Sequence, residues 1–200
     1  MVDGNSYSII KDIKEYAKEN KVPIMQDEGI DFLTTFIIKH QINNVLEIGT
    51  AIGYSAIMMV LCNPNVKVTT IERDEKRYLE AVKNIKKLNL EDRITLIFND
   101  ALETKIDDEF DLIFIDAAKS QNIKFFDKYK KNLLPNGYII TDNMMFHGLI
   151  KKDETEIKSR DLRGLVRKIK LYIEFLKNND KYKTVFYDDI GDGIAVTTMK

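Results

Sequence analysis

The chain has 200 residues, of which 44% are hydrophobic, and this is enough for one sizeable core and a single domain. Its 31 Lys and Arg residues against 32 Asp and Glu residues give a formal net charge of −1, which does not indicate a general nucleic-acid or membrane binder. The opening residues lack the regions of a signal peptide, and no apolar run approaches the roughly 20 residues of a membrane span. The single cysteine, Cys62, cannot form an internal disulfide, so a cytoplasmic protein is expected.

Two helices are expected before the first strand. The first is predicted to start at a cap formed by Asn5 or Ser6 and to end at about Asn20. The second is an apolar-rich helix at about Ile30–Lys39. The loop between them, Met25–Gly29, leads towards the first strand, and it is either a segment that closes over a ligand or an ordinary connection between helices.

The central motif is the segment Val45–Ser55, in which a short apolar run ends at two glycines and an amphipathic stretch follows. This pattern predicts a strand, a tight turn and a helix. Gly49 and Gly53 permit positive φ and let a ligand lie against bare backbone, beside the first N–H groups of the helix. The spacing Gly-x-x-x-Gly is not the dinucleotide fingerprint Gly-x-Gly-x-x-Gly, which argues against a pyrophosphate here. A nucleotide-type cofactor fits the turn, and a turn that binds nothing would show the same pattern.

Strands and helices alternate along the rest of the chain, which predicts a doubly wound α/β fold with a mostly parallel sheet. After the first strand, the expected elements are strands over 66–71, 93–98, 110–115 and 138–141 and helices over 74–88, 120–134 and 155–178. Two last strands, 182–187 and 193–199, have so short a connection that they must pair antiparallel. We therefore expect seven strands with a reversed strand at the edge. The single domain 1–200 divides into a helical cap, 1–43, and an α/β core, 44–200.

Polar residues follow the ends of successive strands, at the edge of the sheet where doubly wound folds bind ligands. Glu72 ends the second strand, where a carboxylate can hold a ribose diol. Asp116, Asp142 and Asn143 follow two later strands and are hard oxygen ligands suited to Mg²⁺. Each acid alone is more consistent with a strand-end cap or a solvated turn, so the prediction of a metal site depends on the three together. No cluster of Cys and His indicates zinc.

Basic residues lie near these acids in the sequence. Lys119 comes three residues after Asp116, and beside a divalent cation it could act as a base or stabilise an oxyanion. The alternative for Lys119 is a surface lysine at the start of a helix. His147 either touches substrate or, more simply, is a loop histidine. The segment 151–183 holds eleven Lys and Arg against six Asp and Glu, so one face or edge of the molecule is expected to be basic.

Four motifs together resemble a known family. Glu-Ile-Gly-Thr-Ala-Ile-Gly-Tyr-Ser at 47–55, Asp-Ala-Ala-Lys at 116–119, Asp-Asn at 142–143 and Ile-Gly-Asp-Gly-Ile at 190–194 resemble the class I S-adenosylmethionine-dependent O-methyltransferases of the catechol and caffeoyl-CoA type. The resemblance covers nearly the whole chain. It implies a Rossmann-like methyltransferase fold with extra N-terminal helices, S-adenosylmethionine and Mg²⁺ as cofactors, and a homodimer.

The resemblance also implies roles for individual residues. The residues expected to bind S-adenosylmethionine are Met25, Glu47, Gly49, Tyr54, Ser55, Glu72, Asp100, Ala101 and Asp116. Mg²⁺ would be bound by Asp116, Asp142 and Asn143. Lys119 would be the catalytic lysine, with Asp116 beside it in the reacting site.

Within this family, the short length, the segment Val22–Gly29, the Asp-Asn-Met-Met-Phe-His-Gly loop and the Arg-rich late helix are most similar to bacterial tRNA 5-hydroxyuridine methyltransferases. This implies methylation of the 5-hydroxyl of wobble 5-hydroxyuridine to 5-methoxyuridine, with the tRNA anticodon loop contacting the basic segment 151–183. The alternative is a small-molecule catechol-type O-methyltransferase that uses the same site, with the basic helix merely solvated. A third hypothesis is a non-catalytic binding module, against which the intact Asp, Asn and Lys residues argue.

Overall fold

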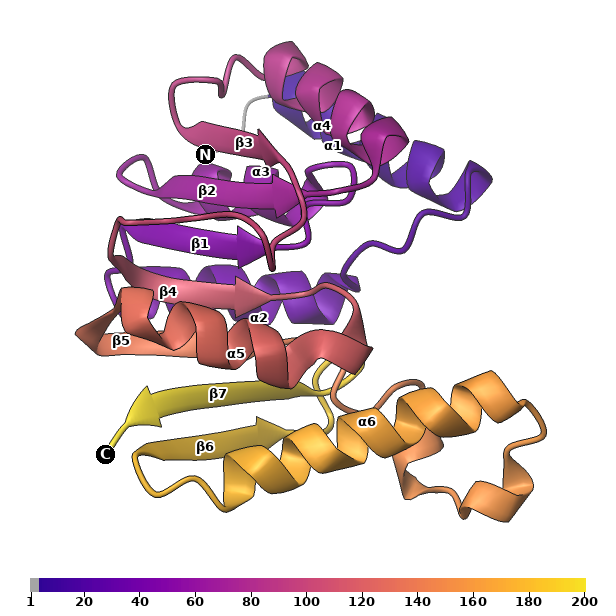
Figure 1. Cartoon of the computed structure of the whole chain (residues 1–200). Helices are drawn as coiled ribbons and strands as arrows, with labels where there is room; N and C mark the ends of the chain where they lie inside the picture. Colours follow the sequence, from indigo (N-terminus) through magenta and orange to yellow (C-terminus); the bar gives the residue numbers. More distant parts are fainter. Residues whose placement is uncertain (1–3) are drawn as a thin grey trace.

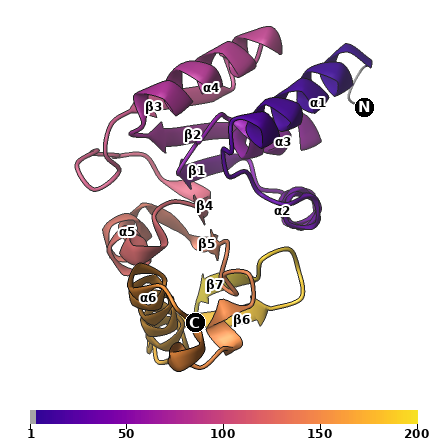
Figure 2. The same ribbon diagram turned by 90° about the vertical axis from the view of Figure 1, so that its right-hand side faces the viewer.

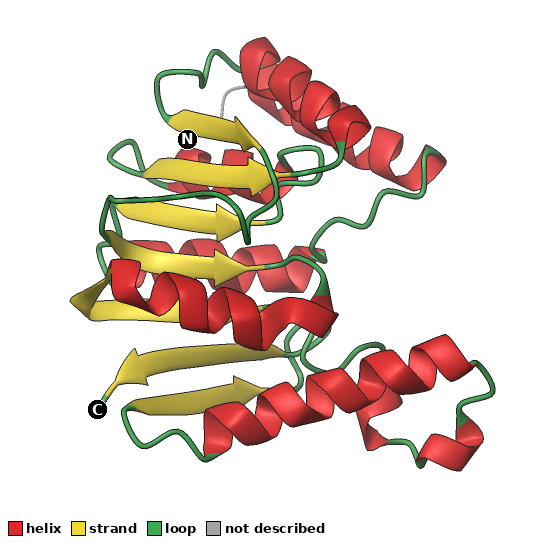
Figure 3. Cartoon of the chain, in the orientation of Figure 1, coloured by secondary structure: helices red, strands yellow, loops and turns green. Residues whose placement is uncertain are grey.

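A seven-stranded sheet runs through the molecule and carries helices on both faces (Figure 1, Figure 3). The computed structural model describes residues 4–200. The strands are β1 Asn44–Ile48, β2 Lys67–Glu72, β3 Ile94–Phe98, β4 Phe110–Ile115, β5 Leu133–Thr141, β6 Tyr182–Tyr187 and β7 Ile194–Met199. Their order in the sheet is β3-β2-β1-β4-β5-β7-β6.

The helices form two layers. Within the described residues the α-helices are α1 Gly4–Glu19, α2 Asp27–Lys39, α3 Tyr54–Cys62, α4 Glu75–Lys87, α5 Asn122–Tyr129 and α6 Arg160–Lys177. Short 3₁₀ helices are η1 Lys119–Gln121, η2 Lys130–Asn132, η3 Leu149–Lys151 and η4 Glu154–Glu156. Figure 2 shows α5 and α6 on one side of the sheet and α1, α2 and α3 on the other. None of the helices in residues 4–200 combines the length and the apolar character needed to cross a membrane.

Side chains on the two faces of the sheet pack into two separate hydrophobic cores. Val45 packs in the core formed with α1 to α4, whereas Leu46 and Ile48 pack in the core formed with α5 and α6. All three side chains are fully buried. Both faces of a doubly wound sheet are covered by helices, which is why β1 is buried at every position from Val45 to Ile48 rather than at alternate positions.

The reversed strand lies at the end of the sheet that was expected. β7 pairs antiparallel with both β5 and β6, because the connection between β6 and β7 is far too short for a crossover helix. The predicted fold, seven strands in a doubly wound and mostly parallel sheet with a reversed strand at this edge, is confirmed. β7 itself lies one position inside β6.

The N-terminal helices begin earlier than predicted. Asn5 and Ser6 already lie within α1 rather than capping it, and α2 begins at Asp27 rather than at Ile30. The predicted loop Met25–Gly29 is therefore mostly the first turn of α2. Both helices fall within the segment 1–43 that was predicted as a helical cap, and residues 1–3 of that segment lie outside the described range.

Two later elements also differ from the prediction. β5 begins at Leu133 and continues through Pro135-Asn136-Gly137, where a turn was expected, and its register with β4 shifts between Phe110 and Leu112. α6 begins at Arg160 rather than at about Thr155. Its start is fixed by Ser159, whose hydroxyl oxygen accepts a hydrogen bond from the backbone N–H of Leu162 at 3.4 Å.

Candidate active site

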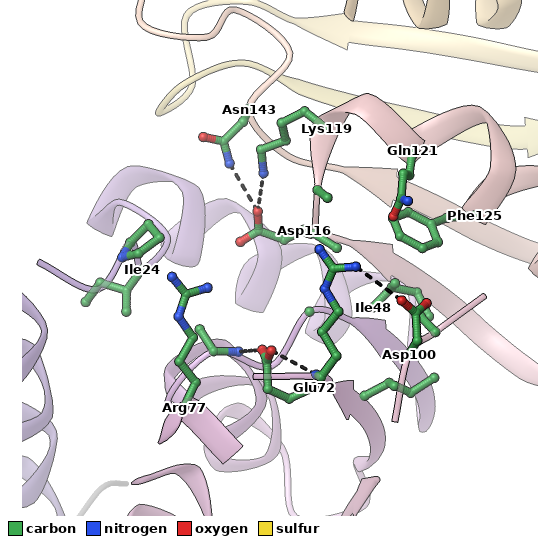
Figure 4. A pocket seen from close by; sticks show the side chains of 18 of the residues that line it. Ile24, Ile48, Glu72, Arg77, Asp100, Asp116, Lys119, Gln121, Phe125 and Asn143 are labelled. Atoms are coloured by element: carbon green, nitrogen blue, oxygen red, sulfur yellow. Dashed lines mark hydrogen bonds and ion pairs between the residues drawn. The ribbon is translucent and has the colours of Figure 1, made fainter. Parts of the chain in front are cut away.

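A cavity of about 420 Å³ lies at the carboxyl ends of the parallel strands, lined by the loops that follow β1 to β5 (Figure 4). The predicted site residues that line it are Gly49, Glu72, Asp100, Ala101, Asp116, Lys119 and Asn143. These residues come from five different loops and span nearly a hundred positions of the chain. Parallel strands bring them together because all of their carboxyl ends meet at one edge of the sheet.

Gly49 allows β1 to lie directly against the end of β4. Its φ is +101°, and a Cβ atom at this position would lie 2.2 Å from the backbone oxygen of Asp116. A side chain is therefore excluded both by the backbone conformation and by the space available. The bare backbone of Gly49 forms the part of the cavity wall next to Asp116.

Glu72 is held at the end of β2 by three backbone donors. Its Oε1 accepts from the N–H groups of Arg73 at 2.9 Å and Asp74 at 2.8 Å, and its Oε2 accepts from the N–H of Ala51 at 2.8 Å. Glu72 is only 7% exposed. Since each carboxylate oxygen has two acceptor positions, one position remains on Oε2 for a ligand hydroxyl. The glycine turn and the acid predicted to act together are thus joined by a hydrogen bond.

Asp100 is fixed in the same way at the end of β3. Its Oδ1 accepts from the backbone N–H of Leu102 at 2.7 Å, and its Oδ2 pairs with the Arg73 guanidinium at 3.1 Å. The Leu102 hydrogen bond, followed by the interaction with Arg73, lowers the pKa of Asp100 below its ordinary value. The neighbouring Ala101 is buried, and its backbone oxygen accepts from the Tyr129 hydroxyl. This end of the cavity carries a carboxylate whose orientation is fixed by hydrogen bonds.

Two of the predicted metal ligands, Asp116 and Asn143, meet at the opposite wall, and the third, Asp142, is buried behind it. Asp116 Oδ1 accepts from Lys119 Nζ at 2.6 Å and from Asn143 Nδ2 at 3.2 Å, and Figure 4 shows both side chains pointing at this carboxylate. Asn143 Nδ2 also donates to Asp142 Oδ2 at 2.8 Å. The Asn143 amide is therefore shared by the two carboxylates, and the three side chains are close enough together to share one cation.

The charges of this cluster favour a cation. Burial, followed by the charge of Asp116, raises the pKa of Asp142 to about 7. When Asp142 is ionised, two carboxylates face one ammonium group and one neutral amide, a set that a hard dication would complete through oxygen ligands. In the described part of the chain no three His, Cys, Asp or Glu side chains gather as a metal site. The predicted site differs from such a cluster because its third ligand is an Asn. Its two carboxylates and one amide oxygen form a donor set that fits Mg²⁺.

Four residues predicted to bind the cofactor lie behind the cavity wall. Glu47 is fully buried and accepts hydrogen bonds from the hydroxyls of Ser55 and Thr70, each at 2.5 Å. The Tyr54 hydroxyl is 3.4 Å from Asp27 Oδ1, and Met25 is buried in the core against α2 and α3. Their side chains do not line the cavity. Their assignment to the cofactor stays a prediction that depends on backbone contacts or on movement of the wall.

The burial of Glu47 should make the protein less stable as the pH rises. Burial raises the pKa of Glu47 from 4.5 to about 7, so between these values the folded state binds more protons than the unfolded state. Stability should fall across this window, by about 3 kcal/mol in all, and stay level above it. Glu47→Gln should remove this part of the pH dependence. The free energy of unfolding of both proteins is measured in urea between pH 5 and pH 8. Parallel plots of this free energy against pH for the wild type and Glu47→Gln would contradict the prediction.

Several residues that line the cavity were not predicted from the sequence. Arg73, Arg77, Phe125 and Phe146 line the cavity. Arg73 follows Glu72 directly and Phe146 follows the Asp-Asn pair closely, so proximity to predicted ligands was the signal available for them. The position of Phe125, in the middle of α5, offered no such signal.

Comparison with known proteins gives the family. The model of the O-methyltransferase family matches residues 3–200. A crystal structure from Staphylococcus aureus, provisionally named a caffeoyl-CoA O-methyltransferase, is 37% identical, with a TM-score of 0.90 over 96% of this chain and 92% of that one. An O-methyltransferase from Bacillus cereus in complex with S-adenosylhomocysteine (SAH) is 27% identical, with a TM-score of 0.81 over 96% and 91%. A caffeoyl-CoA O-methyltransferase from Populus kitakamiensis is 28% identical over 191 residues, covering 92% of this chain and 80% of the relative.

These matches extend over nearly the whole chain, including every loop that lines the cavity. The Bacillus cereus structure holds SAH, the product that S-adenosylmethionine leaves after methyl transfer, in a protein of the same fold. The chain belongs to the family of S-adenosylmethionine-dependent O-methyltransferases.

Proposed function

We propose that this protein methylates one of two adjacent oxygens on a small catechol-type acceptor, with S-adenosylmethionine as the methyl donor and Mg²⁺ as the metal. The observation that carries the proposal is the convergence of Asp116, Asn143 and Lys119 on one wall of the cavity, across from Glu72, with the buried Asp142 hydrogen-bonded to Asn143 behind that wall. A donor site and an acceptor site within one cavity are what group transfer between two bound molecules requires.

The donor half of the cavity suits a nucleoside. Glu72 is held by three N–H groups and keeps an acceptor position for a ribose hydroxyl. Asp100 and Ala101 lie next along the sheet edge, where they would face the adenine. The backbone of Gly49 lines the cavity next to Asp116, and the methionine part would lie against it with its sulfonium next to the acceptor wall.

The acceptor half suits a chelating diol. Asp116, Asp142 and Asn143 would hold Mg²⁺, which when bound lowers the pKa of an acceptor hydroxyl and fixes its orientation. Lys119 is held at Asp116 and is placed to stabilise the negative oxygen left when the acceptor loses its proton. The Lys119 side chain is only 16% exposed, so its charge is poorly screened by water.

A small acceptor is favoured by the relatives. The Populus kitakamiensis relative is named a caffeoyl-CoA O-methyltransferase, and a caffeoyl group carries two adjacent hydroxyls on one ring. A metal ion held by these Asp and Asn ligands would require only two adjacent oxygens on the acceptor. It would not require contacts to the rest of a polymer. A catechol satisfies this requirement with the smallest set of contacts.

A wobble 5-hydroxyuridine in tRNA is the second candidate, because it also presents two adjacent oxygens. The support for it is the position of the segment from η3 to the start of α6, which projects beyond the carboxyl edge of the sheet and carries Lys151, Lys152 and Arg160 (Figure 1). Against it, Arg167 pairs with Glu154, and Arg163 donates to the backbone oxygens of Ile157 and Lys158. These two arginines hold the segment itself together and are less available to phosphates.

One assay separates the two acceptors. The purified protein is incubated with S-adenosylmethionine and Mg²⁺, in parallel with 3,4-dihydroxybenzoate, with 3-hydroxybenzoate, and with tRNA containing 5-hydroxyuridine. Mass spectrometry is expected to show a methylated product from 3,4-dihydroxybenzoate and none from 3-hydroxybenzoate, which lacks the second oxygen. Formation of 5-methoxyuridine without methylation of the catechol would select the tRNA reading instead.

A further inference from the structure

The loop after β5, residues 143–148, has a strained backbone and lines the acceptor side of the cavity. Asn143, Phe146 and His147 have φ values of 63°, 44° and 54°, and Gly148 follows at 75°. Side chains other than glycine rarely occupy this region, so such a conformation persists only where surrounding contacts enforce it. Asn143, Phe146 and His147 all line the cavity, which links the strain directly to the site.

The contacts that enforce it come from the turn between β6 and β7. The N–H of Met144 donates to the backbone oxygen of Gly193 at 2.9 Å, and the N–H of Met145 donates to that of Asp192 at 2.8 Å. The N–H of His147 donates to Oδ1 of the Asp192 side chain. Asp192 therefore holds the loop at two points, once with its backbone and once with its carboxylate.

The second oxygen of this carboxylate has no hydrogen-bond partner. Asp192 is 7% exposed, and its Oδ2 is a buried acceptor left unpaired within residues 4–200. The ring of His147 lies beside it, with Nδ1 at 3.5 Å from Oδ2. The His147 side chain is 69% exposed, so a small rotation of its ring can bring Nδ1 into hydrogen-bond range. An unpaired buried carboxylate oxygen is costly, and this rotation would satisfy it.

We propose that His147 binds the acceptor and that Asp192 is a positioning residue that fixes its tautomer. With Nδ1–H donating to Asp192 Oδ2, the other ring nitrogen, Nε2, carries a lone pair. From its place at the cavity, Nε2 then accepts a hydrogen bond from an acceptor hydroxyl. The part that concerns the acceptor rests on the proposed function, whereas the pairing of Asp192 with His147 does not.

Asp192→Asn separates positioning from loop anchoring. An Asn side chain keeps an oxygen to accept from the N–H of His147, but it places an NH₂ group where Oδ2 was. That NH₂ group would donate to Nδ1 and thereby move the ring proton to Nε2. His147 would then present a donor to the acceptor instead of a lone pair, with the loop still in place. The matched control is Asp189→Asn, at an exposed position of the same turn.

Nitrogen NMR of the histidine side chains tests the pairing without any acceptor. The chain has only two histidines, and the other, His40, is identified by its hydrogen bond to the Tyr138 hydroxyl and by its loss in His40→Gln. At a pH where both rings are neutral, His147 should be the Nδ1–H tautomer in the wild type and in Asp189→Asn. It should change to Nε2–H in Asp192→Asn. The same tautomer in wild type and Asp192→Asn would overturn the proposal.

Kinetics test the role in acceptor binding. With 3,4-dihydroxybenzoate, His147→Ala and Asp192→Asn should each lower kcat/KM for the acceptor about tenfold, the effect of one lost hydrogen bond. The double variant should be no worse than His147→Ala, and the affinity for SAH should not change. An equal loss from Asp192→Asn with and without His147 would reduce Asp192 to a loop anchor and overturn the proposal. A wild type that leaves the catechol unmethylated rejects the proposed function, and the NMR result still decides the pairing.

Discussion

Asp142→Asn is expected to abolish methyl transfer while leaving the affinity for SAH unchanged. Asp142 is 4% exposed and shares the Asn143 amide with Asp116, so it provides half of the negative charge of the predicted metal site. The substitution keeps the volume of the side chain but removes that charge. A bound metal contributes several kcal/mol to the stabilisation of the transition state, so kcat should fall by about 10³-fold or more.

The measurement has two parts. Turnover of 3,4-dihydroxybenzoate is followed over a series of Mg²⁺ concentrations, and SAH binding is followed by calorimetry. Asp111→Asn is the matched control, because Asp111 accepts from the N–H groups of Asn43 and Asn44 at the opposite edge of the sheet. Asp111→Asn should keep both the turnover and the SAH affinity of the wild type. Wild-type turnover by Asp142→Asn in metal-free buffer would remove the metal from the mechanism.

The strands could be predicted from the sequence because burial on two faces leaves an obvious pattern. Phe110–Ile115 and Tyr182–Tyr187 are apolar or alternating runs bounded by charged residues, and both have the predicted ends. The reversed strand followed from the length of one connection. Both arguments use only local information, and this is why they succeed.

Other boundaries depend on contacts between distant residues, which local patterns do not contain. α2 begins at Asp27, whose carboxylate accepts two hydrogen bonds from Lys14 Nζ of α1, at 2.6 and 2.7 Å. β5 continues through Pro135 because its irregular register lets Leu133 pair with Phe110 before the regular ladder resumes. Neither contact can be inferred from the residues near the boundary.

The residues of the site likewise include some that could be predicted from the sequence and some that could not. Asp116 and Asn143 could be placed together because residues at the ends of neighbouring parallel strands meet at one edge. The pairing of Glu47 with Ser55 and Thr70 could not be predicted, since the sequence does not show that this carboxylate turns away from the cavity. The sequence indicated Asp192 only as part of the motif Ile-Gly-Asp-Gly-Ile at 190–194, without a role of its own. Its contact with His147 joins segments 45 residues apart through the turn of a hairpin.

Glu72→Gln is expected to weaken the binding of SAH about 100-fold. Three N–H groups converge on the carboxylate, those of Arg73 and Asp74 on Oε1 and that of Ala51 on Oε2. A glutamine has one acceptor oxygen, so in either orientation its NH₂ group faces at least one of these donors. The turn that carries Ala51 would shift, and the ribose would lose a hydrogen bond to a charged group, which contributes about 1.5–3 kcal/mol.

Calorimetry with two ligands identifies the cause. SAH should lose affinity for Glu72→Gln, whereas an SAH analogue without the ribose hydroxyls should lose much less, because it never makes the missing hydrogen bond. Glu75→Gln, at an exposed position in the first turn of α4, is the control and should bind SAH like the wild type. Unfolding in urea should show Glu72→Gln destabilised by about 1–3 kcal/mol, the cost of an unsatisfied buried donor. Unchanged SAH affinity would place the ribose elsewhere in the cavity, because no ligand hydroxyl could then depend on this carboxylate.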